Sequence, residues 1–157
     1  MPGWREIVAS SLDWEQARAS FDHALEGLPA ELRGKRPSGF PHSVWELVEH
    51  IRLANHDLLA FMTADEYEDP KWPDDYWPSS PAPRNDAEWK HAIDEIRRET
   101  QALKDLTLDE SRDLTAKIPR GTGQTYLRTV LVAVDHNSYH VGQIVAVRRL
   151  LGAWPAG

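Results

Sequence analysis

The stretch Val134-Asp135-His136-Asn137-Ser138-Tyr139-His140-Val141-Gly142-Gln143 lies in the middle of a segment, residues 124–151, in which apolar residues recur at helical spacing. The segment contains no proline and a single internal glycine, so the pattern predicts a long helix. Residues four apart on a helix project from the same face, one turn above the other. We therefore expect His136 and His140 to point the same way, with their rings close enough to bind one metal ion.

This predicted helix carries apolar residues on two opposite sides. Only a narrow strip between them is polar, and it consists of Arg128, Asp135, Tyr139 and Arg149. A helix that is apolar nearly all round is normally buried. The helix is therefore either the central one of the protein or one whose second side forms a subunit interface, and we favour the interface of a homodimer.

The bulk composition is that of a globular protein. A length of 157 residues favours a single domain, residues 1–157, which is large enough for a substantial core. Hydrophobic residues make up 41% of the chain and charged residues 27%, which is ordinary for a soluble domain. No apolar run approaches the roughly 20 residues that a membrane span needs, so we expect no association with a membrane.

Charge and cysteine usage narrow the classes of function. The formal net charge is −7, and the Lys and Arg residues cluster too weakly to displace counterions from phosphates, so we expect no binding of nucleic acid. The chain has no cysteine, which excludes disulfides, a thiolate nucleophile and a cysteine-ligated zinc finger. Since the N-terminal stretch is charged and lacks a signal-peptide core, we expect a cytoplasmic protein.

Two segments in the first half of the chain have helical periodicity. Residues 4–28 carry apolar residues at helical spacing and are expected to form one helix. A second helix is expected over residues 44–63. It follows Ser43-Val44-Trp45-Glu46, where a hydroxyl and a carboxylate three residues apart precede an apolar periodic run, which is the pattern of a capping box.

A third helix is expected to begin at Asn85 or Asp86 and to end before Thr107. With residues 124–151 this makes four long helices, and we predict an all-α four-helix bundle with long crossover loops. Facing helices of such bundles build metal sites in the core. The crossover of residues 66–84 holds five prolines with aromatic rings between them. It is either a loop anchored by its rings, which we favour, or a lid over a site.

Among the other five histidines, one is a candidate ligand for the same metal ion. His50 lies at the edge of the inner face of the second predicted helix. The remaining four point outward or lie outside a helix, and they are His23, His42, His56 and His91. Inward placement therefore leaves three candidate metal ligands, which are His50, His136 and His140.

Three histidines that face one another suit a divalent metal ion. Neutral imidazoles bind zinc, nickel, copper and ferrous iron, and three protein ligands leave a position open for water or substrate. Metal-bound histidines usually donate their second ring nitrogen to a carboxylate or a carbonyl. Glu46, Asp57 and Gln143 are the candidates for that role. The alternative is a metal-free bundle in which the histidines are hydrogen-bonded core residues.

Two of these segments also resemble motifs of a known family. They are Ser43-Val44-Trp45-Glu46-Leu47-Val48-Glu49-His50-Ile51 and, more specifically, His136-Asn137-Ser138-Tyr139-His140-Val141-Gly142-Gln143-Ile144, which is followed by Arg148-Arg149-Leu150-Leu151-Gly152-Ala153-Trp154-Pro155. They resemble the DinB-like family of bacterial four-helix metal-binding proteins, whose superfamily also contains bacillithiol transferases and mycothiol-dependent enzymes. The order and length of the predicted helices are similar over essentially the whole chain.

The resemblance implies that His50, His136 and His140 bind a zinc, nickel or iron ion and that the protein is a homodimer. It also implies a metal-dependent hydrolase or thiol S-transferase, with a small-molecule substrate and a low-molecular-weight thiol as a candidate partner. Many members of the family have no assigned reaction. A stress-associated metal-binding protein without turnover is therefore the alternative, and the sequence leaves open whether the protein is an enzyme.

Overall fold

The computed structural model describes residues 1–155, which form helices joined by long loops. Within these residues there is no strand, and the nearest approach to one is an isolated antiparallel bridge between Lys117 and Thr125. The expectation of an all-α fold is confirmed. The expected domain of residues 1–157 also includes Ala156 and Gly157, which lie outside the described residues. In the described part of the chain, no helix is both long enough and apolar enough to cross a membrane.

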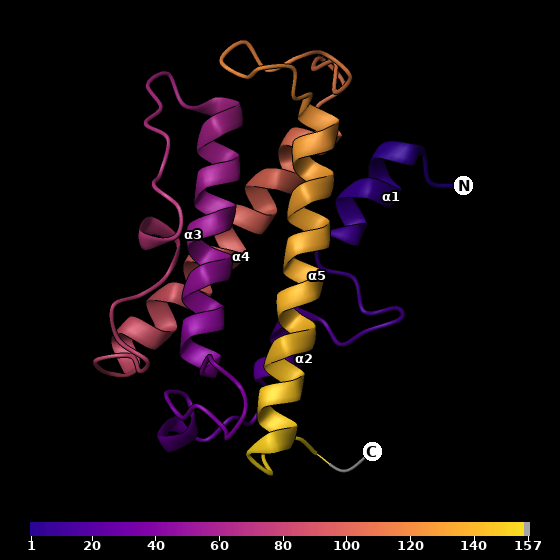
Figure 1. Cartoon of the computed structure of the whole chain (residues 1–157). Coiled ribbons are helices and arrows are strands. Elements are labelled where there is room, and N and C mark those ends of the chain that lie inside the picture. The colour runs from indigo at the N-terminus through magenta and orange to yellow at the C-terminus, as the bar shows by residue number, and fades with distance from the viewer. Residues whose placement is uncertain (156–157) are drawn as a thin grey trace.

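Three long helices form the frame of the protein. α3 (Val44–Thr63) and α5 (Tyr126–Leu150) lie side by side and run in opposite directions, and α4 (Asp86–Leu108) crosses behind them (Figure 1). The long crossover between α3 and α4 runs along the outer side of α3 and contains the short helix η2 (Asp74–Tyr76). Three of the four long helices of the predicted bundle, and the long crossover loop between α3 and α4, are therefore present in the structure.

Side-chain caps fix where these helices begin. Ser43 Oγ accepts a hydrogen bond from the Glu46 main-chain N–H, and the Glu46 carboxylate accepts one from the Ser43 N–H, so the predicted capping box is confirmed. Asn85 caps α4 and Thr125 caps α5 through their side-chain oxygens. α4 continues to Leu108, slightly beyond its predicted end, because Leu106 and Thr107 are still buried against the core.

The expectation of one helix over residues 4–28 is wrong. The structure has two short helices, α1 (Trp4–Ser11) and α2 (Phe21–Leu25), followed by the 3-10 turn η1 (Ala30–Leu32). Between Leu12 and Phe21 the chain has no apolar stripe that could hold a helix against the core. Instead, α1 packs on α4 while α2 packs on α5. The Ser20 hydroxyl caps the N-terminus of α2. The fourth position of the bundle is thus shared by two helices.

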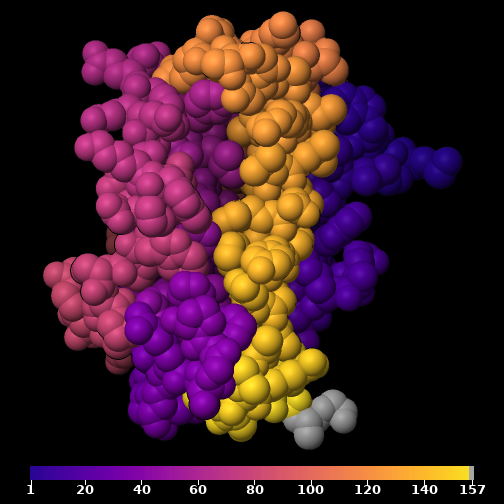
Figure 2. All heavy atoms as spheres, viewed as in Figure 1, coloured from indigo at the N-terminus to yellow at the C-terminus, as the bar shows by residue number. Residues whose placement is uncertain are grey.

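α5 is buried on one side and open on the other. Figure 2 shows it on the surface along its whole length. The exposed strip is wider than expected, since Leu131 is 46% exposed and Leu150 is 59% exposed, in addition to the predicted polar positions. The second apolar side of this helix is therefore partly accessible, and the expected homodimer stays a prediction.

Two apolar clusters fill the interior, one toward each end of the long helices. One cluster includes Leu47, Ile51, Ile96, Val141 and Ile144. The other includes Met62, Leu103, Leu106, Val130 and Ala133. Between the two clusters lie the buried polar side chains of Asn55 from α3, Glu99 from α4 and Asn137 from α5, in addition to that of His140. We call Asn55, Glu99 and Asn137 the polar layer.

Candidate metal centre

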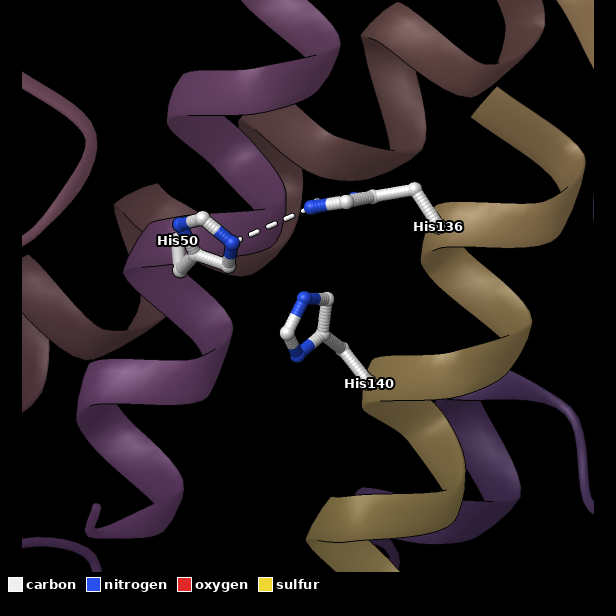
Figure 3. A group of neighbouring side chains, drawn as sticks. All are labelled: His50, His136 and His140. Atoms are coloured by element: carbon white, nitrogen blue, oxygen red, sulfur yellow. Dashed lines mark hydrogen bonds between the residues drawn. The ribbon is translucent and has the colours of Figure 1, made fainter. Parts of the chain in front are cut away.

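The three predicted histidines meet where α3 and α5 pack together. His50 projects from α3, and His136 and His140 project from successive turns of α5 toward it (Figure 3). One ligand atom of each residue lies within 4.8 Å of those of the other two. The histidines that the sequence excluded lie elsewhere, since His23, His56 and His91 are exposed on their helices. The structure therefore brings together the residues that could hold a metal ion.

The second ring nitrogen of His50 is fixed by the crossover loop. His50 Nδ1 lies 2.8 Å from the main-chain carbonyl oxygen of Tyr76. A carbonyl only accepts hydrogen bonds, so Nδ1 carries the proton and Nε2 keeps its lone pair. The lone pair of Nε2 faces His136, whose Nε2 is 3.0 Å away (Figure 3). This is the tautomer that a metal ligand requires.

His140 is oriented in the same manner from its own helix. Its Nδ1 lies 2.7 Å from the side-chain oxygen of Gln143, and the Gln143 amide in turn donates to the hydroxyl of Tyr139. The proton of His140 is therefore on Nδ1, which leaves Nε2 available. His136 differs from the other two, because its buried Nδ1 has no hydrogen-bond partner among the described residues.

Burial keeps the three imidazoles neutral. Desolvation is the main cause that lowers the pKa of His50 and of His136 below the usual value of 6.5. The pKa of His140 falls to about 4, first through desolvation and then through repulsion from His136 and His50. Since an imidazolium ion cannot bind a metal ion, these shifts favour the neutral form, in which each of the three rings keeps one nitrogen free of a proton at neutral pH.

Aromatic rings of the crossover loop cover His50. The indole of Trp77 stacks on the His50 ring with a centroid distance of 4.0 Å, and its other face stacks on His42 at 4.1 Å. Trp72 approaches the edge of His50 with a centroid distance of 6.3 Å. As a result His50 is only 3% exposed and His140 only 7%. The loop is thus anchored by its rings, as favoured from the sequence, and it lies on the histidine cluster.

Asp57 anchors this loop to α3. Its carboxylate accepts hydrogen bonds from the hydroxyls of Tyr67 and Tyr76, at 2.7 and 2.6 Å. Desolvation, followed by the hydrogen bond to Asp57, raises the pKa of both phenols, so they remain donors. Asp57 therefore fixes Tyr76, and the carbonyl of Tyr76 fixes His50.

The three residues predicted to orient the histidines have different roles. Gln143 contacts His140 directly, whereas Asp57 acts on His50 only through Tyr76. Glu46 contacts none of the histidines of the cluster, because it is occupied by the capping box and by Arg36. Sequence reasoning missed the Tyr76 carbonyl, since a main-chain acceptor leaves no mark on residue type. It also missed His42, which contributes through its stack on Trp77.

The donor set fits a divalent metal ion. Two nitrogen ligands of a tetrahedral zinc ion, each about 2.05 Å from the metal, lie about 3.3 Å apart. The 3.0 Å between Nε2 of His50 and Nε2 of His136 is close to that separation. Three neutral nitrogen donors with no carboxylate suit zinc, nickel or ferrous iron rather than magnesium or calcium.

A bundle of long antiparallel helices whose inner faces bring three histidines together defines a class of helical metal-binding proteins. The family comparison agrees with this class. The chain belongs to the DinB superfamily, whose family model matches residues 13–144. The matched region includes all three histidines and the crossover loop. No curated protein and no solved structure matched the chain.

Proposed function

We propose that this DinB protein is a metal-dependent enzyme, a hydrolase or a thiol S-transferase, whose ion is held by His50, His136 and His140. The observation that carries the proposal is the convergence of three neutral imidazoles from two helices, two of which have their second nitrogen tied to an acceptor. Three protein ligands leave at least one coordination position for water or substrate.

A divalent ion at this position supplies Lewis acidity, which lowers the pKa of a water molecule or a thiol at the site. The chain's own residues provide the surroundings. Tyr76 and Gln143 hold the tautomers of His50 and His140, while Trp72 and Trp77 exclude bulk water from the side of the loop. The exposed hydroxyl of Tyr139, on the turn between His136 and His140, lies at the solvent side, where a small-molecule substrate would arrive.

Metal analysis of the purified protein tests the site. Wild type is expected to contain about one equivalent of zinc, nickel or iron per chain, and His50→Ala and His136→Ala are expected to lose it. His91→Ala is the control, because His91 is an exposed histidine of α4 that forms no side-chain hydrogen bond with the described residues. Equal metal content in all four proteins would refute the three-histidine site.

A metal-binding protein without turnover is the second candidate. It is favoured by one specific observation, which is the stack of Trp77 on His50 that leaves the ring 3% exposed. Structural metal sites are closed, whereas catalytic sites keep an accessible position. In this alternative the ion stabilises the junction of α3, α5 and the crossover loop.

Two measurements separate the candidates. A structural ion is expected to raise the melting temperature strongly over the chelator-treated protein, with no turnover in screens of ester, amide and thiol-plus-electrophile substrates. An enzyme is expected to convert at least one substrate, and the rate is expected to vanish in His136→Ala and to persist in His91→Ala. A low-molecular-weight thiol that raises the rate would assign the transferase class.

We also propose that the protein is a cytoplasmic homodimer. The support for the dimer is that α5 is accessible along the surface (Figure 2), with Leu131 and Leu150 as its exposed leucines. Sedimentation is expected to give twice the mass of the chain for wild type. Leu131→Asp combined with Leu150→Asp is expected to give monomers, whereas Leu108→Asp, an exposed leucine of α4, is expected to stay dimeric.

A further inference from the structure

A cavity lies next to the histidine cluster, between the helices. It has a volume of about 330 Å³ and is bounded by the connection between α1 and α2 and by the inner faces of α3, α4 and α5. Three of its lining residues, Ile51, Asn137 and Val141, directly follow the three histidines in the sequence. Because successive residues of a helix point about 100° apart, the cavity and the metal centre lie on neighbouring faces of the same helix turns. Its size falls in the lower range of small-molecule sites.

The wall of this cavity contains a buried polar group without a partner. Asn137, a member of the polar layer, is only 6% exposed, and its side-chain oxygen forms no hydrogen bond of normal geometry with the described residues, although it lies close enough to the His136 ring to raise the pKa of that ring. A buried amide without a partner costs free energy, so such groups usually face a ligand or an ordered water. Thr100 and Gln101 of α4 add further polar groups to the same cavity.

Arg18 places a positive charge at the cavity. It comes from the connection between α1 and α2, where its Nε donates to the Ser138 hydroxyl at 3.0 Å and its Nη1 donates to the Ala19 carbonyl at 2.9 Å. These bonds hold the guanidinium on the α5 side of the cavity. Within residues 1–155 its Nη2 has no hydrogen bond and no carboxylate forms a salt bridge with it.

The other charged groups of the cavity already have partners. Asp13 pairs with Lys104 at 2.5 Å, and Asp22 pairs with Arg97 at 2.7 Å. Arg18 is therefore the one lining charge without a salt bridge in the described part of the chain, although the carboxylate of Asp13 lies near enough to oppose the desolvation that lowers the pKa of Arg18. The apolar part of the lining consists of Leu12, Phe21, Ile51, Ile96 and Val141.

We infer that this cavity is a binding site for a small carboxylate with an apolar body. The carboxylate would accept hydrogen bonds from Arg18 Nη2, since guanidinium groups are the preferred partners of carboxylates in partly buried sites. The apolar body would occupy the space between Phe21, Ile96 and Val141. The Asn137 amide would bond a polar atom of the ligand in place of its missing partner. The site does not depend on a metal ion.

Phenylacetate is a suitable probe, because it joins a carboxylate to an apolar ring, and phenylacetamide is its uncharged counterpart. Amide chemical shifts of the isotope-labelled full chain are expected to report saturable binding of phenylacetate with a Kd of about 1 mM, as expected for ten heavy atoms of modest ligand efficiency. Phenylacetamide is expected to bind at least about tenfold more weakly, because it lacks the charge that Arg18 recognises.

Two variants locate the site and one serves as the control. Arg18→Gln removes the charge and is expected to weaken phenylacetate about tenfold or more. Thr100→Phe fills the cavity without touching Arg18 and is expected to abolish binding. Arg128→Gln is the matched control, because Arg128 is an exposed arginine of α5, and it is expected to bind like wild type. Melting curves of each variant verify that it is folded.

A carboxylate could also bind to the metal ion itself, so each titration is repeated after chelation. Binding that survives chelation and is lost in Arg18→Gln supports the cavity site whether or not the three histidines hold a metal. Binding that disappears on chelation, or that is unchanged in Arg18→Gln, would overturn the inference. So would the lack of saturable binding of phenylacetate to wild type up to about 10 mM, ten times the expected Kd.

Discussion

The Nδ1 atom of His50 donates a hydrogen bond to the carbonyl of Tyr76, 2.8 Å away and in the middle of the crossover between α3 and α4. The loop therefore contributes to the histidine cluster through its main chain as well as through the ring of Trp77. Since Asp57 holds the phenol of Tyr76, one surface carboxylate of α3 is coupled to the orientation of a candidate metal ligand.

This coupling predicts that Asp57 affects metal affinity without contacting the metal. In Asp57→Ala, Tyr76 loses its acceptor while Tyr67 keeps only Asp69, and the Tyr76 carbonyl is held less firmly, so metal affinity is expected to fall several-fold, up to about tenfold. Tyr76→Phe keeps the carbonyl but removes the anchor, and it is expected to act in the same direction. Competition with a chromophoric chelator measures both. Glu68→Ala, an exposed carboxylate of the same loop, is the control.

Gln143 is predicted to affect metal affinity directly, because it contacts the candidate ligand His140. In Gln143→Leu the Nδ1–H of His140 loses its acceptor at 2.7 Å, and metal affinity is expected to fall by about tenfold or more. Gln143→Glu supplies a stronger acceptor and is expected to restore or exceed the affinity of wild type. The same competition assay applies, with Arg149→Gln on the exposed side of α5 as the control. Unchanged affinity in Gln143→Leu would argue against His140 as a ligand.

The metal-free protein is predicted to lose stability in mild acid. The unfolded chain binds a proton at His140 below about pH 6.5, whereas burial lowers its folded-state pKa to about 4. Its contribution to the free energy of unfolding is therefore complete above pH 6.5 and is lost as the pH falls toward 4. The loss is on the order of 2–3 kcal/mol.

Urea unfolding of chelator-treated protein, at pH values above, within and below this window, measures the effect. His140→Gln cannot be protonated at this position and is expected to show a flatter pH dependence than wild type. His91→Gln removes an exposed histidine and is expected to reproduce the wild-type curve. Parallel curves for His140→Gln and wild type would show that His140 is not the origin of the acid sensitivity.

Ser43 is predicted to stabilise both α3 and the end of the crossover loop. Its hydroxyl accepts from the Glu46 N–H and donates to the Pro81 carbonyl, 2.5 Å away. Ser43→Ala removes both bonds and is expected to lower the free energy of unfolding by about 1–2 kcal/mol. Thermal or urea unfolding measures the change. Ser111→Ala, in an exposed turn, is expected to have a much smaller effect.

The sequence predicted the long helices well because their signals are local. The hydroxyl and carboxylate of Ser43 and Glu46 mark the start of α3, and a proline-free periodic segment marks α5. The position of each histidine on its helix also identified the candidate ligands, since His50 and the two histidines of α5 lie on inward faces while His56 does not. Each of these conclusions depends on residues within a few turns of one another.

The sequence-based predictions failed where contacts between residues far apart in the chain determine the structure. Residues 4–28 had apolar residues at acceptable spacing, but α1 and α2 pack on different partners and the connection between them is not helical. The cover of His50 by Trp77 depends on how residues 66–84 fold back along α3. Neither a packing partner chosen in three dimensions nor a main-chain acceptor such as the Tyr76 carbonyl can be inferred from periodicity.

The parallel stack of Trp77 on His50, with an interplanar angle of 1°, gives the protein an internal optical probe. An open-shell ion such as nickel or ferrous iron, if held by that imidazole, would quench the indole emission, whereas closed-shell zinc would leave it bright. The difference in fluorescence between wild type and Trp77→Phe isolates this one ring from the other six tryptophans. A titration would then distinguish the occupying ions by brightness alone.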